Sequence, residues 1–421
     1  MRAPITHFQL SSLTFFLYFA LGAVTPMISL YLLNYLHFSG KQTGLILSVS
    51  AVSALVSPLV SSFLADRVLP AERLFGYCLL IGGTMMGVLY QTHSFTAFLV
   101  GYFFYMVAAG PAVTLSNTII FHKIRDRREY GQIRAWGTAG WIAVAWVFGW
   151  LWLRGADGQT IPDRMPDALL LSSIFAIGLG LWSFTLPASI ELKRNGKPEF
   201  IPRSALAVAR QPAFIGLAVI TLMANITDRF YYYAAGKFLV QGCGVKESNM
   251  MPMLSIGQIP EVFAMALLGR LTTRLGLLPV MLLGAGCNIA RYVFFIFGNG
   301  STLATVAGIF MHGLAYAFFF STVFILLDSL TEKESRAGVH QLFTLCYSGS
   351  GGVLGSWIAG FSTDACMNAD GIIDFQKLWC VPLGFSLVVF ISLAISYRHF
   401  AAHLPDPAPA PEPPPADIDE P

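Results

Sequence analysis

Long apolar stretches separated by short polar segments recur along the whole chain. A helix needs about 20 predominantly apolar residues to cross the hydrocarbon core of a membrane. Stretches of this length predict twelve membrane-spanning helices, at residues 10–34, 44–64, 73–92, 95–120, 130–153, 167–187, 212–237, 250–269, 277–297, 301–327, 338–361 and 378–398. The pattern therefore predicts an all-α integral membrane protein.

The polar segments indicate an internal repeat. The most charged connection, ELKRNGKPEFIPRS, follows the sixth apolar stretch. The loop after the second stretch contains Asp66 and Arg67, and the loop after the eighth contains Thr273 and Arg274, an offset of 207 residues in a chain of 421. Such a repeat predicts two pseudo-symmetric six-helix halves with a substrate site at the midplane between them.

This repeat predicts the domain organisation and the orientation. We expect an N-terminal half at 1–190, a cytoplasmic linker at 191–211, a C-terminal half at 212–400 and a disordered Pro-rich acidic tail at 401–421. Cytoplasmic loops of membrane proteins carry an excess of Lys and Arg. With both termini placed in the cytoplasm, the inner segments hold seventeen of these residues and the outer loops six, so we predict that both termini are cytoplasmic.

The composition supports a membrane protein and excludes several functions. The chain is 55% hydrophobic and 12% charged, where a soluble domain carries about 25% charge. A net charge of +3 without a basic stripe gives no reason to expect nucleic-acid binding. The sequence has no P-loop, HExxH or GxSxG motif, which argues against an ATP-driven pump and against an enzyme. The cysteines show no metal-binding spacing, so we expect no metal and no cofactor.

The polar or ionisable residues inside the predicted spans that we consider as functional candidates are Arg134, Asn225, Asp228, Arg229, Gln258, Glu261 and Arg291. Such residues are expensive in lipid and usually mark a substrate or ion pathway. Asn225 and Asp228 are three residues apart, as are Gln258 and Glu261, so each pair shares one face of its helix. We expect these faces to line a cavity, because lipid cannot solvate them.

Glu261 is the main candidate for carrying a proton. It follows Pro260 in the apolar run SIGQIPEVFAMALLG and has no basic residue beside it in the sequence. A buried unpaired charge is costly, so a carboxyl group that gains and loses a proton suits this position, and Asp228 is the second candidate. The structural alternative is an ion pair of Asp228 or Glu261 with Arg134, Arg229 or Arg291 that only fixes the helix register.

The aromatic residues need a separate interpretation. The runs FFLYF, YFFYM, RFYYYA and YAFFF are expected mostly to face lipid or to pack. Trp141 and Tyr316 are the exceptions, because each faces a polar helix in the predicted architecture and can stack against a flat ligand. Cys366 and Cys380 flank a predicted outer loop, and whether they form a disulfide stays open.

Five segments carry a family resemblance: FLADRVLPAERLFGY, IRAWGTAGW, SIGQIPEVF, RAGVHQLFTLCYSGSGGVLGSWIAG and DGIIDFQKLWCVPLG. In these the chain resembles the major facilitator superfamily and, within it, the bacterial nucleoside–proton symporters. The similarity extends over residues 8–400. It implies a monomeric transporter of the bacterial inner membrane that carries a nucleoside and protons and has only lipid as a further partner.

The resemblance also implies roles for individual residues. Arg134, Thr138 and Trp141 would hold the ribose and base, with Asn225, Asp228, Gln258, Glu261 and Tyr316 facing them from the other half. Asp66 and Arg67 would help to hold the inner ends of the spans together when the cytoplasmic side is closed. Two positions depart from the family: Ala317 stands where nucleoside permeases carry an aspartate, and Asp228 replaces the second amide of span seven.

Two other functions are compatible with the sequence. The same fold could carry a sugar or an aromatic acid, with Arg134 as the carboxylate clamp, although Asp228 and Glu261 would then be unfavourable neighbours. A transport-inactive membrane receptor would need a cytoplasmic partner surface, for which the acidic tail is the one unusual segment. We expect import of a nucleoside by proton symport.

Overall fold

A computed structural model describes residues 6–53, 56, 69–124, 129–187, 203–298, 300–331 and 335–401. The described residues form helices joined by short loops, with two isolated β-bridges, Arg154–Thr160 and Met367–Ile373, in place of a sheet. The helices of the first half are α1 (His7–Val24), α2 (Ile28–Leu30), η1 (Tyr31–Tyr35), α3 (Gly40–Ser48), α5 (Ala71–Tyr90), α6 (Phe95–Lys123), α7 (Glu129–Trp146), η3 (Val147–Leu153), η4 (Pro162–Arg164) and α8 (Asp167–Ser183).

The helices of the second half follow the same up-and-down course. They are α9 (Arg203–Ala209), α10 (Pro212–Lys237), η5 (Phe238–Gly242), α11 (Glu247–Ser255), α12 (Gln258–Leu275), α13 (Leu277–Phe297), α14 (Thr302–Ala315), η6 (Tyr316–Phe320), α15 (Ser321–Ser329), α16 (Arg336–Thr344), η7 (Leu345–Gly349), α17 (Ser350–Ala365) and α18 (Phe375–Ala401).

Local sequence explains where several helices begin. The side chains of Thr6 and Ser39 each accept a hydrogen bond from the backbone N–H three residues on. The side chains of Gln9 and Gln42 in turn accept from the backbone N–H groups of Thr6 and Ser39, which makes two capping boxes before α1 and α3. Ser94 caps α6, and Pro212 starts α10 at a position where its missing N–H costs nothing. These signals fix the ends of spans whose interiors are too uniformly apolar to do so.

The observed spans agree with most of the prediction. In the part of the chain that the structure describes, ten helices are long and apolar enough to cross a membrane. The eleventh predicted span corresponds to the continuous helix formed by α16, η7 and α17. The second predicted span begins as α3, and most of its remainder, with the loop that contains Asp66 and Arg67, lies outside the described residues.

The expected linker and tail are only partly described. Residues 188–202 and 402–421 lie outside the described part of the chain. Within the expected linker, the short helix α9 contacts α16 of the second half. The prediction that the tail is disordered is therefore not addressed by the structure.

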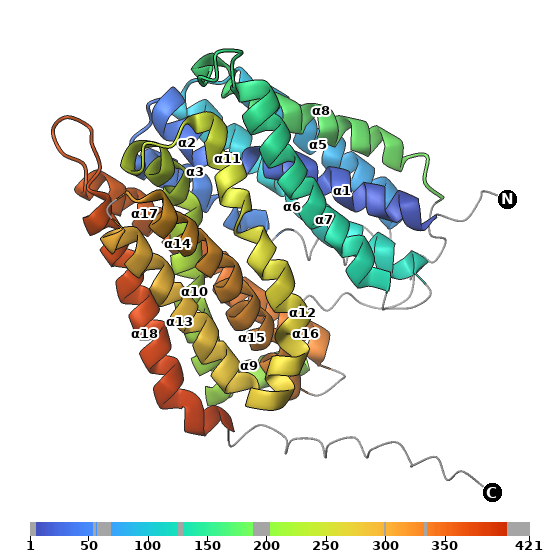
Figure 1. Cartoon of the computed structure of the whole chain (residues 1–421). Coiled ribbons are helices and arrows are strands. Elements are labelled where there is room, and N and C mark those ends of the chain that lie inside the picture. The colour runs from blue at the N-terminus through green and yellow to red at the C-terminus, as the bar shows by residue number, and fades with distance from the viewer. Residues whose placement is uncertain are drawn as a thin grey trace, which may run out of the picture.

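The helices pack as two bundles (Figure 1). In the first, α1 contacts α7 and α8, and α5 contacts α6 and α8; in the second, α13 contacts α14 and α18, and α10 contacts α17 and α18. Separate buried apolar clusters fill the two bundles, one around Leu13, Phe75 and Ile119 and one around Leu217, Val323 and Phe343. Contacts between the bundles run through α3 with α17, α2 with α10, and α7 and η3 with α11.

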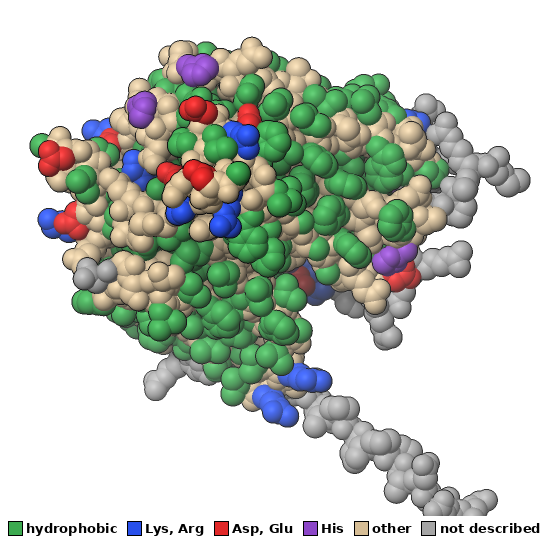
Figure 2. All heavy atoms as spheres, turned by 45° about the horizontal axis from the view of Figure 1, so that its top comes forward, with side chains coloured by type: hydrophobic (Ala, Val, Ile, Leu, Met, Phe, Trp, Pro, Cys, Tyr) green, Lys and Arg blue, Asp and Glu red, His purple; other side chains and the backbone are tan. Residues whose placement is uncertain are grey.

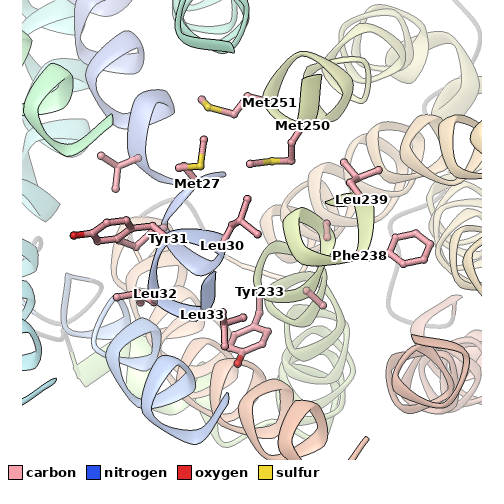
Figure 3. Close-up of a cluster of buried hydrophobic side chains, with 14 of the residues drawn as sticks. Met27, Leu30, Tyr31, Leu32, Leu33, Tyr233, Phe238, Leu239, Met250 and Met251 are labelled. Atoms are coloured by element: carbon pink, nitrogen blue, oxygen red, sulfur yellow. The ribbon is translucent and has the colours of Figure 1, made fainter. Parts of the chain in front are cut away.

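The two bundles are sealed together at one end, which we call the closed end. A buried cluster there joins Met27, Leu30 and Tyr31 of the first half to Tyr233, Phe238 and Met250 of the second (Figure 3).

Hydrogen bonds between the halves reinforce the closed end. Ser29 Oγ donates to the Tyr233 carbonyl at 2.5 Å, and Tyr233 donates to the Gly40 carbonyl at 3.0 Å. The side-chain oxygens of Asp364 accept from the backbone N–H groups of Gly40 and Lys41 at 2.7 and 2.9 Å. The closed end is thus held by side chains from both halves.

The outer surface suits a lipid environment. Figure 2 shows charged side chains gathered on the end that faces up in Figure 1, with hydrophobic side chains over the flanks below it. Large apolar side chains such as Leu151, Phe297, Leu303 and Ile395 are at least three-quarters exposed. A soluble protein would not expose so much apolar surface, and a bilayer covers it.

Candidate functional site

A cavity of about 700 Å³ lies between the two halves. It begins beneath the closed end at Val24 and Ile28, and it extends to Gly131, two residues from the start of α7. Both halves line it, the first with Tyr18, Tyr102, Tyr105, Arg134, Thr138 and Trp141, and the second with Asp228, Arg229, Tyr232, Gln258, Glu261 and Tyr316. The volume lies within the usual range for a small-molecule site.

The three predicted residues of the first half all lie in this cavity, on α7. The Arg134 guanidinium lies 4.2 Å from the centre of the Tyr18 ring, a cation–π contact that holds a long side chain in place. Trp141 packs against Gly22 of α1, where an added Cβ would lie 3.1 Å from the indole. Arg134, Thr138 and Trp141 therefore present a fork of donors, a hydroxyl and a flat ring on one face of α7.

Span eight explains how Glu261 is accommodated in an apolar run. The helix is interrupted at Ile256 and Gly257, and α12 begins anew at Gln258, so that Glu261 lies in its first turn. The break places Pro260 in the first turn of α12, where its missing N–H removes no hydrogen bond from the helix. The N-terminus of a helix favours a negative charge, and Glu261 lies there, partly exposed to the cavity.

A glycine allows this arrangement. Gly313 of α14 lies against the break in span eight, and an added Cβ there would be 2.1 Å from the Gly257 carbonyl oxygen and 2.9 Å from the Glu261 nitrogen. Only glycine fits at such a distance. The close approach of α14 therefore fixes the position of the first turn of α12.

The predicted residues of spans seven and ten divide into two groups. Asp228 and Tyr316 line the cavity. Asn225 is 4% exposed, is not among the lining residues, and packs against α17, where an added Cβ on Gly351 would be 2.9 Å from Asn225 Oδ1. The structure thus separates Asn225 from Asp228, although the two are three residues apart, because the crossing of α17 covers that part of α10.

The sequence analysis missed several cavity residues. Three of the aromatic runs expected mostly to face lipid or to pack contribute tyrosines to the cavity, namely Tyr18, Tyr102, Tyr105, Tyr232 and Tyr233, while Phe103 and Phe104 are exposed as expected. Arg229, which the sequence analysis considered only as an ion-pair partner of a carboxylate, also lines the cavity. In two of these runs the signal was present, because a tyrosine among phenylalanines has a hydroxyl that needs a polar partner.

His312 was missed altogether. It is 3% exposed on α14 and lies between Asp228 and Arg291, in a span that was analysed only for its aromatic residues. A histidine within an apolar span is an ionisable group and would have been a candidate for that reason alone.

Charge is distributed across the cavity in two pairs. Arg134 of the first half is the strongest basic influence on Glu261 of the second half. Arg291 is the strongest on Asp228, followed by Arg229. The first pair bridges the two halves and the second lies within one half, so only the first pair changes its geometry if the halves move.

The described part of the chain shows neither a candidate metal site nor a disulfide. Over the described ranges, no group of three or more His, Cys, Asp or Glu side chains could hold a metal ion. The six cysteines are free thiols, including Cys366 and Cys380. The described residues that line the cavity offer hydroxyl, amide, carboxylate and guanidinium groups and aromatic rings.

Comparison with known proteins gives the family. The model of the family described as "Nucleoside H+ symporter" matches residues 5–401. The chain belongs to this family. It is a multi-pass transporter of the inner membrane with the major facilitator fold, and it is not an enzyme.

Individual relatives agree with this assignment. The chain is 29% identical over 331 residues to the putative nucleoside transporter YegT of Escherichia coli, covering 77% of this chain and 76% of the relative. It is 23% identical to the xanthosine permease of E. coli, covering 93% and 96%.

Among solved structures, the nucleoside transporter NupG superimposes with a TM-score of 0.83 at 20% identity, covering 93% of this chain and 99% of that one. A bacterial homologue of the lysosomal transporter Spinster, in an inward-facing and unoccupied conformation, superimposes with a TM-score of 0.75 at 15% identity. The superposition covers 96% of this chain and 98% of that one. At this identity, the similarity supports the assignment of the fold and nothing more.

Proposed function

We propose that this nucleoside–proton symporter family member imports nucleosides by alternating access and binds them in the cavity between its halves. One observation carries the proposal: Arg134, Thr138 and Trp141 of one half face Asp228, Gln258, Glu261 and Tyr316 of the other across a single cavity of about 700 Å³. Trp141 and Tyr316 offer flat rings to a base, and the hydroxyl, amide and charged groups offer hydrogen bonds to a ribose.

Glu261 is proposed as the carrier of the coupling proton. Its carboxyl group lies in the cavity, and its strongest basic neighbour, Arg134, belongs to the other half. Opening the cavity to one side or the other changes the distance between these two groups, which changes how readily Glu261 holds a proton. Movement of the halves and protonation are thereby linked.

We propose that both termini are cytoplasmic, from the distribution of Lys and Arg. The cavity then extends towards the cytoplasm and the closed end faces outward, so that the structure is inward-facing. Release of a nucleoside would occur from this state, and its uptake would require the closed end to separate. A monomer suffices for this cycle, because both faces of the cavity come from one chain.

The test is uptake into vesicles that contain the purified protein. Labelled nucleosides, sugars and aromatic acids are compared at an imposed proton gradient, with and without an uncoupler. We expect accumulation of one or more nucleosides that is abolished by the uncoupler. Accumulation of only sugars or aromatic acids would assign the other substrate class, and binding without uptake of any solute would favour a receptor.

A further inference from the structure

A cluster of buried polar side chains lies in the second half, beside the central cavity. Its centre is Arg291 of α13, which is 1% exposed. The guanidinium contacts His312 Nδ1 at 2.5 Å and donates to Asn288 Oδ1 at 2.5 Å and to the Tyr292 hydroxyl at 2.6 Å. It also lies over the Tyr231 and Tyr292 rings, 4.7 and 4.6 Å from their centres.

The contacts determine the state of His312. An arginine has only donors, so Nδ1 of His312 accepts from Arg291 and carries no hydrogen. The ring hydrogen is then on Nε2, which lies 3.5 Å from the Tyr232 hydroxyl. His312 is therefore a neutral acceptor, and its 3.8 Å approach to Asp228 is not an ion pair.

The two terminal nitrogens of Arg291 thus contact neutral acceptors, the buried Nε has no hydrogen-bond partner, and the cation requires a counter-charge. Asp228 supplies it, because it is the carboxylate beside the cluster: its Oδ1 lies 3.8 Å from His312 Nδ1, the atom that Arg291 contacts at 2.5 Å. A small cavity of about 20 Å³, room for about one water molecule, is lined by both residues together with Asn288 and His312. Asp228 also lines the central cavity, so it forms the boundary between the buried cluster and the substrate site.

Other titratable groups surround the two carboxylates. They interact electrostatically with Asp228, with Glu261 or with the tyrosines beside them. They are Arg134 of α7, Arg229, Tyr231 and Tyr232 of α10, Tyr292 of α13, His312 of α14, Tyr316 of η6 and Tyr347 of η7. Of the cations in this set, Arg134 acts most strongly on Glu261 and Arg291 on Asp228. Each carboxylate has its own leading partner.

We infer that Arg291 is the fixed counter-ion of Asp228 and thereby determines which carboxyl group takes up the coupling proton. Arg291 and Asp228 belong to the same half, so their pairing persists while the halves move, and Asp228 stays ionised throughout the cycle. The proton is then left to Glu261. Arg291 acts as a positioning residue, held by His312 and Asn288, and Asp228 is a constant negative charge that contacts the substrate.

This inference rests on the proposed function, but its test needs no substrate. Infrared difference spectra between acidic and neutral pH report protonated carboxyl groups in the purified, membrane-reconstituted protein. We expect the wild type to show a band that is lost in Glu261→Gln and retained in Asp228→Asn. Loss of the wild-type band in Asp228→Asn would overturn the inference.

A second comparison tests Arg291 itself. Arg291→Met should produce an additional protonated-carboxyl band, because Asp228 loses its counter-ion, and the double variant Asp228→Asn/Arg291→Met should lack that band. A folded Arg291→Met protein without an additional band contradicts the inference. If Arg291→Met does not fold, the comparison of wild type with Asp228→Asn decides the question.

Glu72→Gln is the matched control, because Glu72 is a fully buried carboxylate with a cationic partner, Lys123, at 3.5 Å outside the cavity. This variant should leave the wild-type band unchanged. Loss of that band would show that it reports a remote carboxyl group and would remove the support for Glu261. Failure of nucleoside uptake in the wild type would overturn the proposed function without changing these spectra.

Discussion

Glu261 and Arg134 face the same cavity from opposite halves, and this makes them the most informative residues to change. Glu261→Gln keeps the shape of the side chain and imitates its protonated form. We expect the variant to exchange labelled nucleoside for unlabelled nucleoside across the membrane, because exchange needs no net proton movement. It should fail to accumulate nucleoside against a gradient, and counterflow and accumulation assays on the same vesicles check both expectations.

Gln258→Ala serves as the comparison for this prediction, since Gln258 lies in the same turn of α12 and carries no charge. It should weaken binding while leaving accumulation sensitive to an uncoupler. If Glu261→Gln still accumulates nucleoside as the wild type does, and an uncoupler abolishes that accumulation, the proton is carried by another group.

Arg134 provides a second prediction at this scale. Arg134→Lys keeps the charge but loses the planar fork that can form two parallel hydrogen bonds. The loss of one charge-assisted bond, about 1.5 kcal/mol, corresponds to roughly tenfold weaker binding. Titration calorimetry or scintillation proximity binding measures it, and unchanged affinity would show that Arg134 does not contact the substrate.

At the scale of elements, the contact between α3 and α17 is the clearest link between the halves. Asp364, in the last turn of α17, accepts hydrogen bonds from the first two N–H groups of α3. A carboxylate is favoured at a helix N-terminus both as a cap and by the helix dipole. Because this cap comes from the other half, it stabilises the closed end and must be released when that end opens.

Asp364→Ala should therefore shift the population away from the closed form. Loss of a cap costs about 1 kcal/mol, which corresponds to roughly a fivefold change in population. Alkylation of Met27→Cys, a position that is 0% exposed in the closed end, measures the change. Asp370→Ala, on an exposed loop nearby, is the control and should leave the alkylation rate unchanged.

At the scale of the whole molecule, the orientation of the chain in the membrane can be tested directly. Gly131 lies in the cavity near the start of α7, and Ala156 lies in an exposed loop beyond η3. In a background without the six native cysteines, Ala156→Cys should react with an impermeant maleimide in intact cells. Gly131→Cys should react only after the cells are opened, and the reverse pattern would place both termini outside.

The tail gives a further prediction for the whole chain. Residues after His403 are rich in proline and acidic residues and have few apolar ones, so they can bury no core. Truncation after His403 should leave expression and nucleoside uptake unchanged within error. Normal expression with a loss of uptake would instead indicate that the tail binds a partner.

The sequence determined the architecture because the bilayer imposes a simple requirement on it. Every span needs a long apolar stretch, so apolar length alone located nearly all of the described helices. The few polar residues within those stretches, such as Arg134 and Glu261, pointed to part of the cavity lining. Span eight is an instructive case. The sequence showed Pro260 directly before Glu261, but only the packing of Gly313 against Gly257 showed where the second part of the span begins.

What only the tertiary structure decided is which polar residues meet. The separation of Asn225 from Asp228 depends on the crossing of α17. Asp228 of α10 and Arg291 of α13 come near each other because His312 of α14 lies between them. Helical spacing places residues on a face but does not say what covers that face. In a bundle whose helices are apolar on nearly all sides, periodicity cannot choose the neighbours, and packing between distant segments makes that choice.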